Sequence, residues 1–427
     1  MRSRRIWSVL PAAMVALAVS HACADSAMRV YPANAELSPQ RLERITDYFN
    51  AEVSNAKIAG AAVLIQRHGK QTYLKSFGKI DTVSGEPMTP DAIFRIHSMS
   101  KPVTSVTAMM LVDDGKLKLD DPLSKYIPSF ATVKVGVETK AENGDPMLKL
   151  VEPDRAITIE DLLRHSSGIT YGFYGKGLVR NAYANANLFA DGTDNASLAE
   201  KIARLPLAEQ PGTLWDYGHS MDILGRVIEV VSGKSLFEFE KERLFGPLGM
   251  TDTAYYVADP AKHRRIAEPI SSDSIFRTGR ARNPRLFTKW ESGGGGLLST
   301  VGDFSRFAQM LLNGGELDGR RYLKPETFAN MTANHIAPAT AVKRGAYYFP
   351  GDGFGYGLGF GVRTEPGNAT PPPPGSLGEI KWDGAGGTYF WIDRGQDMFV
   401  ILMIQSPSER GRIQPALKAM VYDAFER

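Results

Sequence analysis

Apolar residues near the start of the chain recur every three to four positions, which is the spacing of one helix face. The four positions are Leu42, Ile45, Phe49 and Val53. Ser38 precedes them as a cap and Pro39 occupies the first turn, so a helix is predicted to begin here. Two strand-like runs follow, residues 61–67 and 71–77, and the segment His68-Gly69-Lys70 between them predicts a hairpin turn.

The far end of the chain repeats these elements. Residues 389–393 and 398–404 are apolar runs on either side of the turn-like segment 394–397, and they predict a second hairpin. A last helix is predicted over residues 414–425, with Pro415 in its first turn. A hairpin and a helix at each end indicate one antiparallel sheet that is built from both chain termini and flanked by helices.

The middle of the chain shows the helical period instead. The periodic segments are Val103 to Val112, Ile159 to Arg164, Leu198 to Leu205, Met221 to Val231 and Phe304 to Leu312. We therefore expect a mixed α/β (α+β) fold. A mostly helical lobe, residues 98–300, is inserted into an α/β lobe formed by residues 25–97 and 301–427, with the active site between the lobes. The run Pro371 to Pro374 predicts a stiff, exposed loop, because prolines can neither join a β-ladder nor fill a helix interior.

The first residues predict the cellular compartment. Arginines precede an apolar run over residues 6–19, and Ala22-Cys23-Ala24 supplies small residues for cleavage. The run is shorter than the roughly 20 residues that span a bilayer, and Pro11 interrupts it. Residues 1–24 are therefore interpreted as a signal peptide, which predicts a secreted or periplasmic protein with no stable membrane span after cleavage. A lipid-modified Cys23 is the alternative, although His21 fits the usual lipoprotein pattern poorly.

Composition and motif spacing exclude several classes of function. Lys and Arg total 50 against 47 for Asp and Glu, so a net charge of +3 gives no basic field for nucleic acid, and a small-molecule partner is expected. The single cysteine, Cys23, lies in the predicted signal peptide, which excludes cysteine catalysis in the mature chain. The histidines lack metal-ligand spacing, so neither a metal nor another cofactor is predicted. The Gly-rich segment 293–296 lacks the Gly-Lys-Ser/Thr of a phosphate-binding loop. The oligomeric state is left open.

A candidate nucleophile lies in Ser98-Met99-Ser100-Lys101, which has the pattern Ser-x-x-Lys. The pattern alone is weak, since about one or two chance matches are expected in a chain this long, and Ser54-Asn55-Ala56-Lys57 is such a match at a polar helix end. At Ser98 an extended segment meets a helix, and Pro102 places the helix start close by. The Ser98 backbone N–H then lies at a helix N-terminus, where it favours an oxyanion. The spacing of three puts the Lys101 amine beside the Ser98 hydroxyl, where burial would let it act as base.

The blocks around Ser98 resemble the serine β-lactamase-related family, which includes class C β-lactamases, D-Ala-D-Ala carboxypeptidases and family VIII carboxylesterases. The matching stretches, in order, are residues 94–102, 114–122, 161–168, 211–217, 247–250 and 294–300, followed by the C-terminal hairpin. The resemblance runs from about residue 40 to the end. It implies a β-lactamase/transpeptidase-like fold and a covalent acyl-enzyme on Ser98, with Lys101 as its activating partner.

The family's second motif carries a tyrosine, which the resemblance assigns to Tyr217. Tyr183-Ala184-Asn185 spells the lactamase pattern, but it precedes the block at 211–217, whereas the family's tyrosine follows that block and opens a helix. Tyr217 would pass the proton between Ser98, Lys101 and the leaving group, a role for which neighbouring cations must lower the pKa of its phenol. His219 stands where lactamases have Asn, either as a polar substrate contact or as a satisfied histidine near the cleft.

The third motif, Lys-Thr/Ser-Gly in lactamases, aligns with Gly384-Ala385-Gly386 and lacks the cation. That absence predicts neutral substrates such as esters, although Lys381 could partly restore the charge. Esterases of the family often show Trp-x-Gly, here Trp382 and Gly384. The resemblance implies that Trp382, Gly384, Gly386 and His219 form the substrate-binding wall. It also implies that the backbone N–H groups of Ser98 and Gly387 form the oxyanion hole.

These assignments predict a serine hydrolase, with a carboxylesterase favoured over a β-lactamase or D-Ala-D-Ala carboxypeptidase that uses the same machinery. A Gly-x-Ser-x-Gly nucleophile elbow is absent from the sequence, which argues against a conventional triad hydrolase. His165, in the block at 161–168, is interpreted as part of a structural turn. A non-catalytic penicillin-binding-like protein is the alternative of another class, and the intact set of Ser98, Lys101 and Tyr217 argues against it. The natural substrate stays open.

Overall fold

The computed structural model describes residues 31–32, 35–273 and 283–426. The predicted signal peptide, residues 1–24, and Cys23 lie outside these residues. None of the helices in the described ranges is long and apolar enough to cross a lipid bilayer.

The main sheet has seven antiparallel strands in the order β11-β12-β13-β14-β15-β1-β2, so its strands come from both ends of the chain. The strands are β1 (Gly60–Arg67), β2 (Lys70–Gly78), β11 (Phe354–Tyr356), β12 (Gly361–Arg363), β13 (Ile380–Asp383), β14 (Tyr389–Asp393) and β15 (Met398–Ile404). Both predicted hairpins are present, and β1 of one pairs with β15 of the other. The antiparallel sheet, its flanking helices and the mixed α/β fold class predicted from sequence are thereby confirmed.

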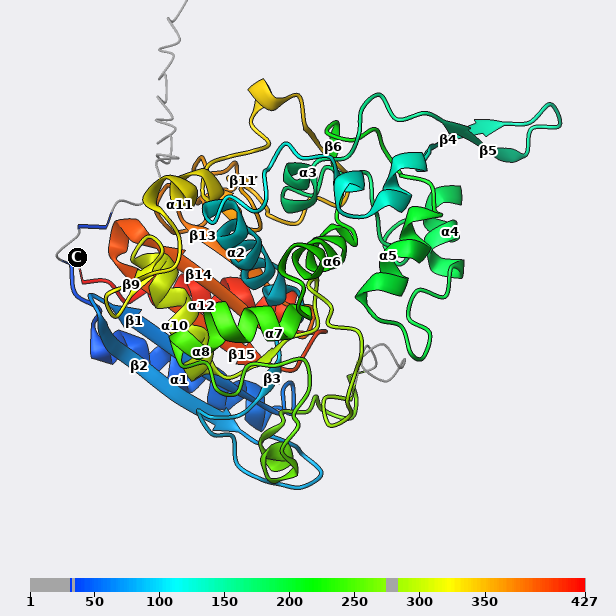
Figure 1. Ribbon diagram of the computed structural model, residues 1–427. Helices are drawn as coiled ribbons and strands as arrows, with labels where there is room; N and C mark the ends of the chain where they lie inside the picture. Colours follow the sequence, from blue (N-terminus) through cyan, green and yellow to red (C-terminus); the bar gives the residue numbers. More distant parts are fainter. Residues whose placement is uncertain (1–30, 33–34, 274–282, 427) are drawn as a thin grey trace, which may run out of the picture.

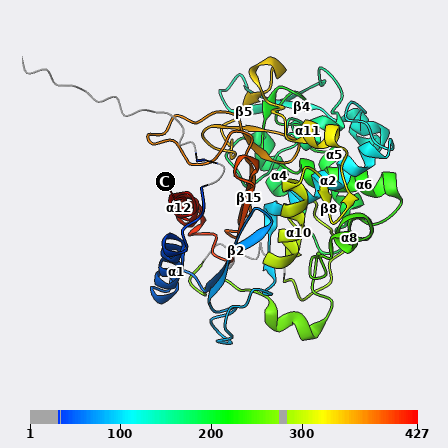
Figure 2. The same cartoon turned by 90° about the vertical axis from the view of Figure 1, so that its left-hand side faces the viewer.

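Two terminal helices cover one face of this sheet, α1 (Pro39–Ser54) and α12 (Arg410–Asp423) (Figure 2). The strands alternate between the two faces, as the pleat requires. Val63 and Leu402 are paired across β1 and β15 and pack beneath the two helices. Their neighbours Leu64 and Ile401 point into the larger core on the other face. The sheet is therefore buried on both faces, and burial of these apolar side chains stabilises it.

Two details of the terminal helices differ from expectation. Ser38 precedes α1, but its hydroxyl donates to Gln40 Oε1 at 3.1 Å and caps no backbone N–H. Pro39 at the first position still favours the helix start. The last helix begins at Arg410, four residues earlier than predicted, so Pro415 lies inside the helix and not in its first turn. The four added residues include Arg410, which lines the cavity described below.

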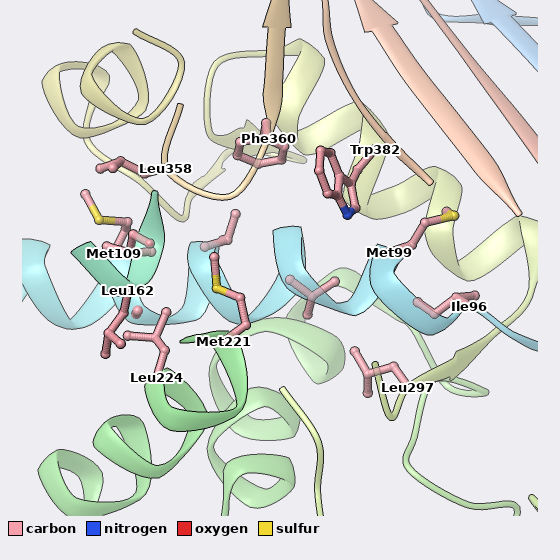
Figure 3. Close-up of a cluster of buried hydrophobic side chains, with 14 of the residues drawn as sticks. Ile96, Met99, Met109, Leu162, Met221, Leu224, Leu297, Leu358, Phe360 and Trp382 are labelled. Carbon is pink, nitrogen blue, oxygen red and sulfur yellow. The ribbon is translucent and has the colours of Figure 1, made fainter. Parts of the chain in front are cut away.

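Helices fill the other side of the sheet and the middle of the chain (Figure 1). They are α2 (Ser100–Asp113), α3 (Ile159–Leu163), α4 (Leu178–Asn185), α5 (Asn195–Ala203), α6 (Ser220–Ser232), α7 (Leu236–Glu240), α8 (Gly246–Leu248), α10 (Val301–Leu312) and α11 (Pro325–Met331). The helix α2 lies at the centre of the core. Figure 3 shows Met221 and Leu224 of α6 on one side of α2, and Phe360 and Trp382 on the other.

Short strand pairs lie outside the main sheet. They are β3 (Phe94–Arg95) with β7 (Leu298–Ser299), β4 (Val135–Lys140) with β5 (Pro146–Val151), β6 (Leu214–Trp215) with β10 (Lys343–Arg344), and β8 (Glu316–Leu317) with β9 (Arg320–Arg321). The β4–β5 hairpin extends away from the body in Figure 1 and was not expected from the sequence. The Pro371 to Pro374 loop is partly exposed, and the buried Arg363 guanidinium donates to the carbonyls of Pro373 and Pro374. The division into two lobes stays a prediction.

Candidate active site

Ser98 lies where the chain turns from a strand into a helix, as the sequence predicts. The strand β3 pairs with β7, a short 3-10 turn covers His97–Met99, and α2 begins at Ser100. Buried Ile96 and Met99 fix the two sides of this turn in the core (Figure 3). Ser98 itself is half-buried and lines a cavity. The local fold thus holds its hydroxyl at the surface of the cavity while its backbone is packed.

Lys101 follows one helical turn later, and its side chain is fully buried. Its Nζ atom lies 3.2 Å from Ser98 Oγ, 2.6 Å from the carbonyl oxygen of Gly294 and 3.4 Å from the hydroxyl of Tyr171. A neutral amine has two N–H donors and one lone pair. In this arrangement the Gly294 and Tyr171 oxygens can accept the two N–H groups, which leaves the lone pair for the hydroxyl proton of Ser98.

Burial lowers the pKa of Lys101 to about 7, because the interior disfavours a charged amine. Asp222 and Asp383 oppose this shift by attracting the ammonium form. Burial alone would raise the pKa of Asp222, but hydrogen bonds from His219 and Ser292 lower it, so Asp222 keeps its charge. The amine of Lys101 is therefore poised near neutrality and can take a proton at moderate pH.

Tyr217 lies just before α6 and lines the same cavity as Ser98. Its backbone position is held by Asp216, whose carboxylate accepts from Arg180 at 2.8 Å and whose N–H donates to the carbonyl of His165. The Lys101 Nζ atom lies 4.5 Å from the centre of the Tyr217 ring. Burial raises the pKa of Tyr217 well above its usual value. The expectation that cations lower this pKa is wrong: desolvation dominates, only hydrogen bonds with Ser98 and Trp382 oppose it, and Tyr217 stays a neutral phenol.

His219 is a satisfied histidine. Its Nδ1 atom lies 2.8 Å from Asp222 Oδ2, its ring packs edge-on against Tyr171 at 4.4 Å, and only 2% of its surface is exposed. Asp222 also accepts from the Ser292 hydroxyl at 2.5 Å and from the Gly294 N–H at 3.1 Å. His219 does not line the cavity, so the alternative of a direct substrate contact is not supported.

The Gly-rich segment 293–296 has a role that sequence reasoning missed. The Gly294 carbonyl accepts from Lys101, and the Gly293 carbonyl accepts from Thr104 at 2.9 Å. A Cβ at Gly293 would lie 2.6 Å from the carbonyl oxygen of Met221. Glycine is therefore required for a backbone that passes between α2 and α6 and reaches the buried amine. The segment accepts a hydrogen bond from the Lys101 side chain. This role can be recognised only from contacts in the folded chain.

The third motif is placed differently from expectation. The Gly387 N–H donates to the Gly384 carbonyl at 2.9 Å, so the prediction of Gly387 as an oxyanion donor is wrong. Gly384 and Gly386 are buried and do not line the cavity. A Cβ at Gly384 would lie 2.3 Å from the Ile96 carbonyl oxygen, so this glycine lets the strand end approach the segment that carries Ser98. Ala385 is the exposed residue that lines the cavity, and no backbone acceptor for its N–H occurs among the described residues.

The cavity has a volume of about 300 Å³ and contains both apolar and charged walls. Its lining residues are Ser98, Tyr174, Tyr217, Phe349, Pro350, Asp352, Phe354, Pro373, Lys381, Trp382, Asp383, Ala385, Tyr389, Arg410, Gln414, Pro415 and Lys418. Trp382 is part of its wall, with its ring centre 5.8 Å from that of Tyr217. Lys381, the neighbouring residue on β13, contributes a cation to the wall. The structure therefore brings together Ser98, Tyr217 and Trp382, with Lys101 directly beneath.

The alternative candidates lie elsewhere. Ser54 and Lys57 are exposed at the end of α1. Tyr183 is buried in α4 and does not line the cavity. His165 is fully buried behind Tyr217, with the two rings 4.9 Å apart, and neither ring nitrogen has a partner among the described residues. These positions agree with the interpretations made from the sequence. Among the residues that the structure describes, no group of His, Cys, Asp or Glu side chains is arranged to hold a metal ion.

Comparison with known proteins identifies the family. A family model described as Beta-lactamase matches residues 43–421. The chain is 37% identical over 356 residues to Protein Rv1367c of Mycobacterium tuberculosis, covering 82% of this chain and 86% of that protein. It is 33% identical to a lovastatin esterase of Penicillium rubens, covering 84% and 91% of the two chains. The solved structure of EstCE1, a hydrolase with promiscuous acyltransferase activity, superposes with a TM-score of 0.72 at 23% identity, covering 90% and 98%.

Other relatives of this chain are named as an esterase, acyltransferases and D-alanyl-D-alanine carboxypeptidases. The family match spans most of the chain, and the solved neighbours share the fold. The chain therefore belongs to the Beta-lactamase family.

Proposed function

We propose that this protein is a carboxylesterase that acts through an acyl-enzyme on Ser98. One observation carries the proposal: a buried amine, Lys101, lies 3.2 Å from the hydroxyl of Ser98 at the wall of a cavity. A neutral amine at that distance can remove the hydroxyl proton, and the resulting alkoxide is a nucleophile. Relatives named as esterases support an ester as substrate.

In the first half-reaction, Ser98 Oγ attacks the ester carbonyl carbon and its proton passes to Lys101 Nζ. The carbonyl oxygen becomes an oxyanion, which the backbone N–H groups of Ser98 and Ala385 stabilise. When the tetrahedral intermediate collapses, the bond to the alcohol oxygen breaks. Tyr217 donates its proton to that oxygen and regains one from Lys101, so the alcohol leaves neutral.

In the second half-reaction, water attacks the acyl carbon of the Ser98 ester. Tyr217 takes the water proton as it passes its own proton to Lys101 Nζ, and the oxyanion forms again at the two N–H groups. Collapse breaks the bond between the acyl carbon and Ser98 Oγ, which takes back its proton. The products are a carboxylic acid and the free enzyme, so atoms and charge balance over the cycle.

An ester is favoured over a β-lactam or a peptide because no lysine occupies the third motif. Trp382 lies two residues before this motif and lines the cavity, and Tyr174 and Phe349 add further aromatic rings to its wall. Hydrolysis of a short-chain 4-nitrophenyl ester, measured beside that of a chromogenic cephalosporin, separates the two activities. We expect faster turnover of the ester.

The covalent intermediate gives the direct test. The full chain is incubated with a mixture of esters and lactams, quenched in acid and digested, and mass spectrometry locates the acyl group. We expect the added mass on the peptide that contains Ser98. Ser98→Ala should abolish both the adduct and turnover, while Ser54→Ala, in the second Ser-x-x-Lys sequence, should retain both. An unlabelled chain, or an active Ser98→Ala variant, would refute the proposed function and favour a binding protein.

A further inference from the structure

The β4–β5 hairpin forms an arm that extends away from the body of the molecule (Figure 1). Its two strands make a two-stranded sheet of their own. Val137 and Met147, on one face of this sheet, are 41% and 45% exposed. A two-stranded hairpin is only marginally stable in water by itself, and an exposed strand edge is a template for another strand. The arm therefore has the properties of an interaction surface.

The even-numbered residues of β4 turn their backbone groups to its outer edge. At the root of the strand, the Gly136 N–H donates to the Leu207 carbonyl at 2.9 Å, and the Leu207 N–H donates to the Lys134 carbonyl at 2.8 Å. Because backbone direction alternates along a strand, the N–H and C=O groups of Glu138 and Lys140 face the same edge. No backbone partner for these groups occurs among the described residues. Two residues of β4 thus keep donors and acceptors for another strand.

This edge is complementary to itself. When two copies of β4 pair antiparallel with Thr139 opposite Thr139, each Glu138 lies opposite Lys140 of the second copy. These opposed residues face the shared edge, so each pair can exchange both backbone hydrogen bonds. Opposite charges and paired threonines stabilise such contacts. A register shifted by two residues would oppose Glu138 to Glu138 or Lys140 to Lys140, so the charges favour one register.

Both charged side chains are exposed on the arm. Lys140 has no carboxylate partner among the described residues. Glu138 Oε1 accepts from the Leu178 N–H at 2.6 Å, at the start of α4, which leaves the second carboxylate oxygen for another donor. Side chains two residues apart on a strand point to the same face. One face of the β4 edge therefore presents an acid and a base side by side.

We propose that the protein forms a two-fold symmetric dimer in which the β4 strands of two copies pair and join the hairpins into one four-stranded antiparallel sheet. The partner is a second copy because the segment Glu138-Thr139-Lys140 complements itself. The two-fold axis makes the contact self-limiting, since each copy contributes the same edge. The interface is small, so the dimer is weak and forms at micromolar concentrations. This assembly is independent of the proposed reaction at Ser98.

A pair of charge reversals tests the interface by sedimentation equilibrium. Lys140→Glu places two acids on the edge and Glu138→Lys places two bases, so either variant alone should dimerise at least about tenfold more weakly than the full chain. An equimolar mixture of the two variants restores both Glu–Lys pairs and should form a heterodimer. Damage to the fold could not produce this recovery. Lys149→Glu, on the other strand of the same hairpin, is the matched control and should dimerise as the full chain does.

A cross-link tests the register. The opposed Thr139 residues form a non-hydrogen-bonded pair with Cα atoms about 4.5 Å apart, which permits a disulfide. Thr139→Cys should therefore give a covalent dimer on mild oxidation, seen on a non-reducing gel. Ser84→Cys, at an exposed position outside the hairpin, is the control, and the full chain with Cys23 alone is the blank.

Three results would each overturn the dimer. The first is a full chain that stays monomeric at about 200 µM, a concentration at which even a small specific interface is populated. The second is a mixture of Lys140→Glu and Glu138→Lys that associates no better than its components. The third is Thr139→Cys that cross-links no more than Ser84→Cys. Ester turnover enters none of these measurements, so the proposed function is tested separately.

Discussion

The charge on a single buried amine controls the proposed reaction. Lys101 is the base only when neutral, and burial lowers its pKa to about 7. Below that pH the amine is protonated and cannot take the Ser98 proton, so kcat/KM should fall about tenfold per pH unit. We expect an acid limb with a midpoint near pH 7 in a profile measured with a neutral ester. A rate that stays flat between pH 5 and 8 would contradict this role.

Asp222 offers a sharper form of this experiment. Its carboxylate attracts the Lys101 ammonium and so raises the pKa of the amine. Asp222→Asn removes this attraction, and the acid limb should move to lower pH. Because Asp222 also binds His219 and Ser292, the variant is first checked for folding by circular dichroism. A limb that moves to higher pH, in a folded variant, would show that Asp222 acts in another way.

Tyr217 should act as a proton carrier while staying a neutral phenol. Tyr217→Phe keeps the ring between His165 and Trp382 but removes the hydroxyl, so the fold should be retained. We expect kcat to fall by about 10²- to 10⁴-fold, with a smaller change in KM. Tyr183→Phe serves as the control, since Tyr183 lies in the sequence that matches the lactamase motif but is absent from the cavity. Equal activities of the two variants would remove Tyr217 from the mechanism.

At the scale of elements, the site depends on how closely the turn after β13 approaches the start of α2. A Cβ at Gly384 would lie 2.2 Å from Thr388 Oγ1 and 2.3 Å from the Ile96 carbonyl oxygen. Gly384→Ala must therefore push the strand end away from Ser98. We expect a loss of unfolding free energy of about 1–3 kcal/mol, measured in urea, together with reduced kcat.

Gly302→Ala is the control for that change. Its Cβ would approach only Thr300 Oγ1, at 3.8 Å, within α10. This substitution should leave activity intact and stabilise the helix by about 0.5–1 kcal/mol. If Gly384→Ala is as stable and as active as Gly302→Ala, the close approach has no functional importance.

Local pattern was sufficient for some elements and insufficient for others. The helix α1 and both sheet hairpins follow from apolar periodicity and turn residues, and Pro102 locates the start of α2. In the β4–β5 hairpin Val137, Met147 and Leu150 are exposed, so its apolar residues do not mark a buried face that would have predicted the strands. The early start of α12 was missed because Pro415 is tolerated inside it. In these cases tertiary contacts override local preference.

The residues of the candidate site also differ in how well the sequence predicts them. Ser98, Lys101 and Tyr217 could be found because each stands in a contiguous block of residues. Gly294, Tyr171 and Arg410 could not, since each contacts the site only through folding of distant segments. Gly387 was assigned to the oxyanion hole because sequence shows which residues are glycines and not which N–H groups are already bonded.

At the scale of the whole molecule, the C-terminal helix joins the sheet to the cavity through one buried ion pair. Lys418 of α12 is paired with Glu379, which immediately precedes β13, and both are almost fully buried. Lys418→Met leaves the Glu379 carboxylate buried without its partner. We expect a loss of about 3–5 kcal/mol in unfolding free energy, because a lone buried charge is strongly unfavourable.

A double-mutant cycle distinguishes the ion pair from simple packing. Lys418→Met/Glu379→Gln removes both charges, so much of the lost stability should return, and the two single changes should not be additive. Urea unfolding of the four proteins at pH 7 gives the coupling free energy. Additive losses would mean that the two side chains contribute through packing alone. Recovery would show that this pair holds α12 against β13, and thus holds Arg410 and Gln414 at the cavity that Ser98 lines.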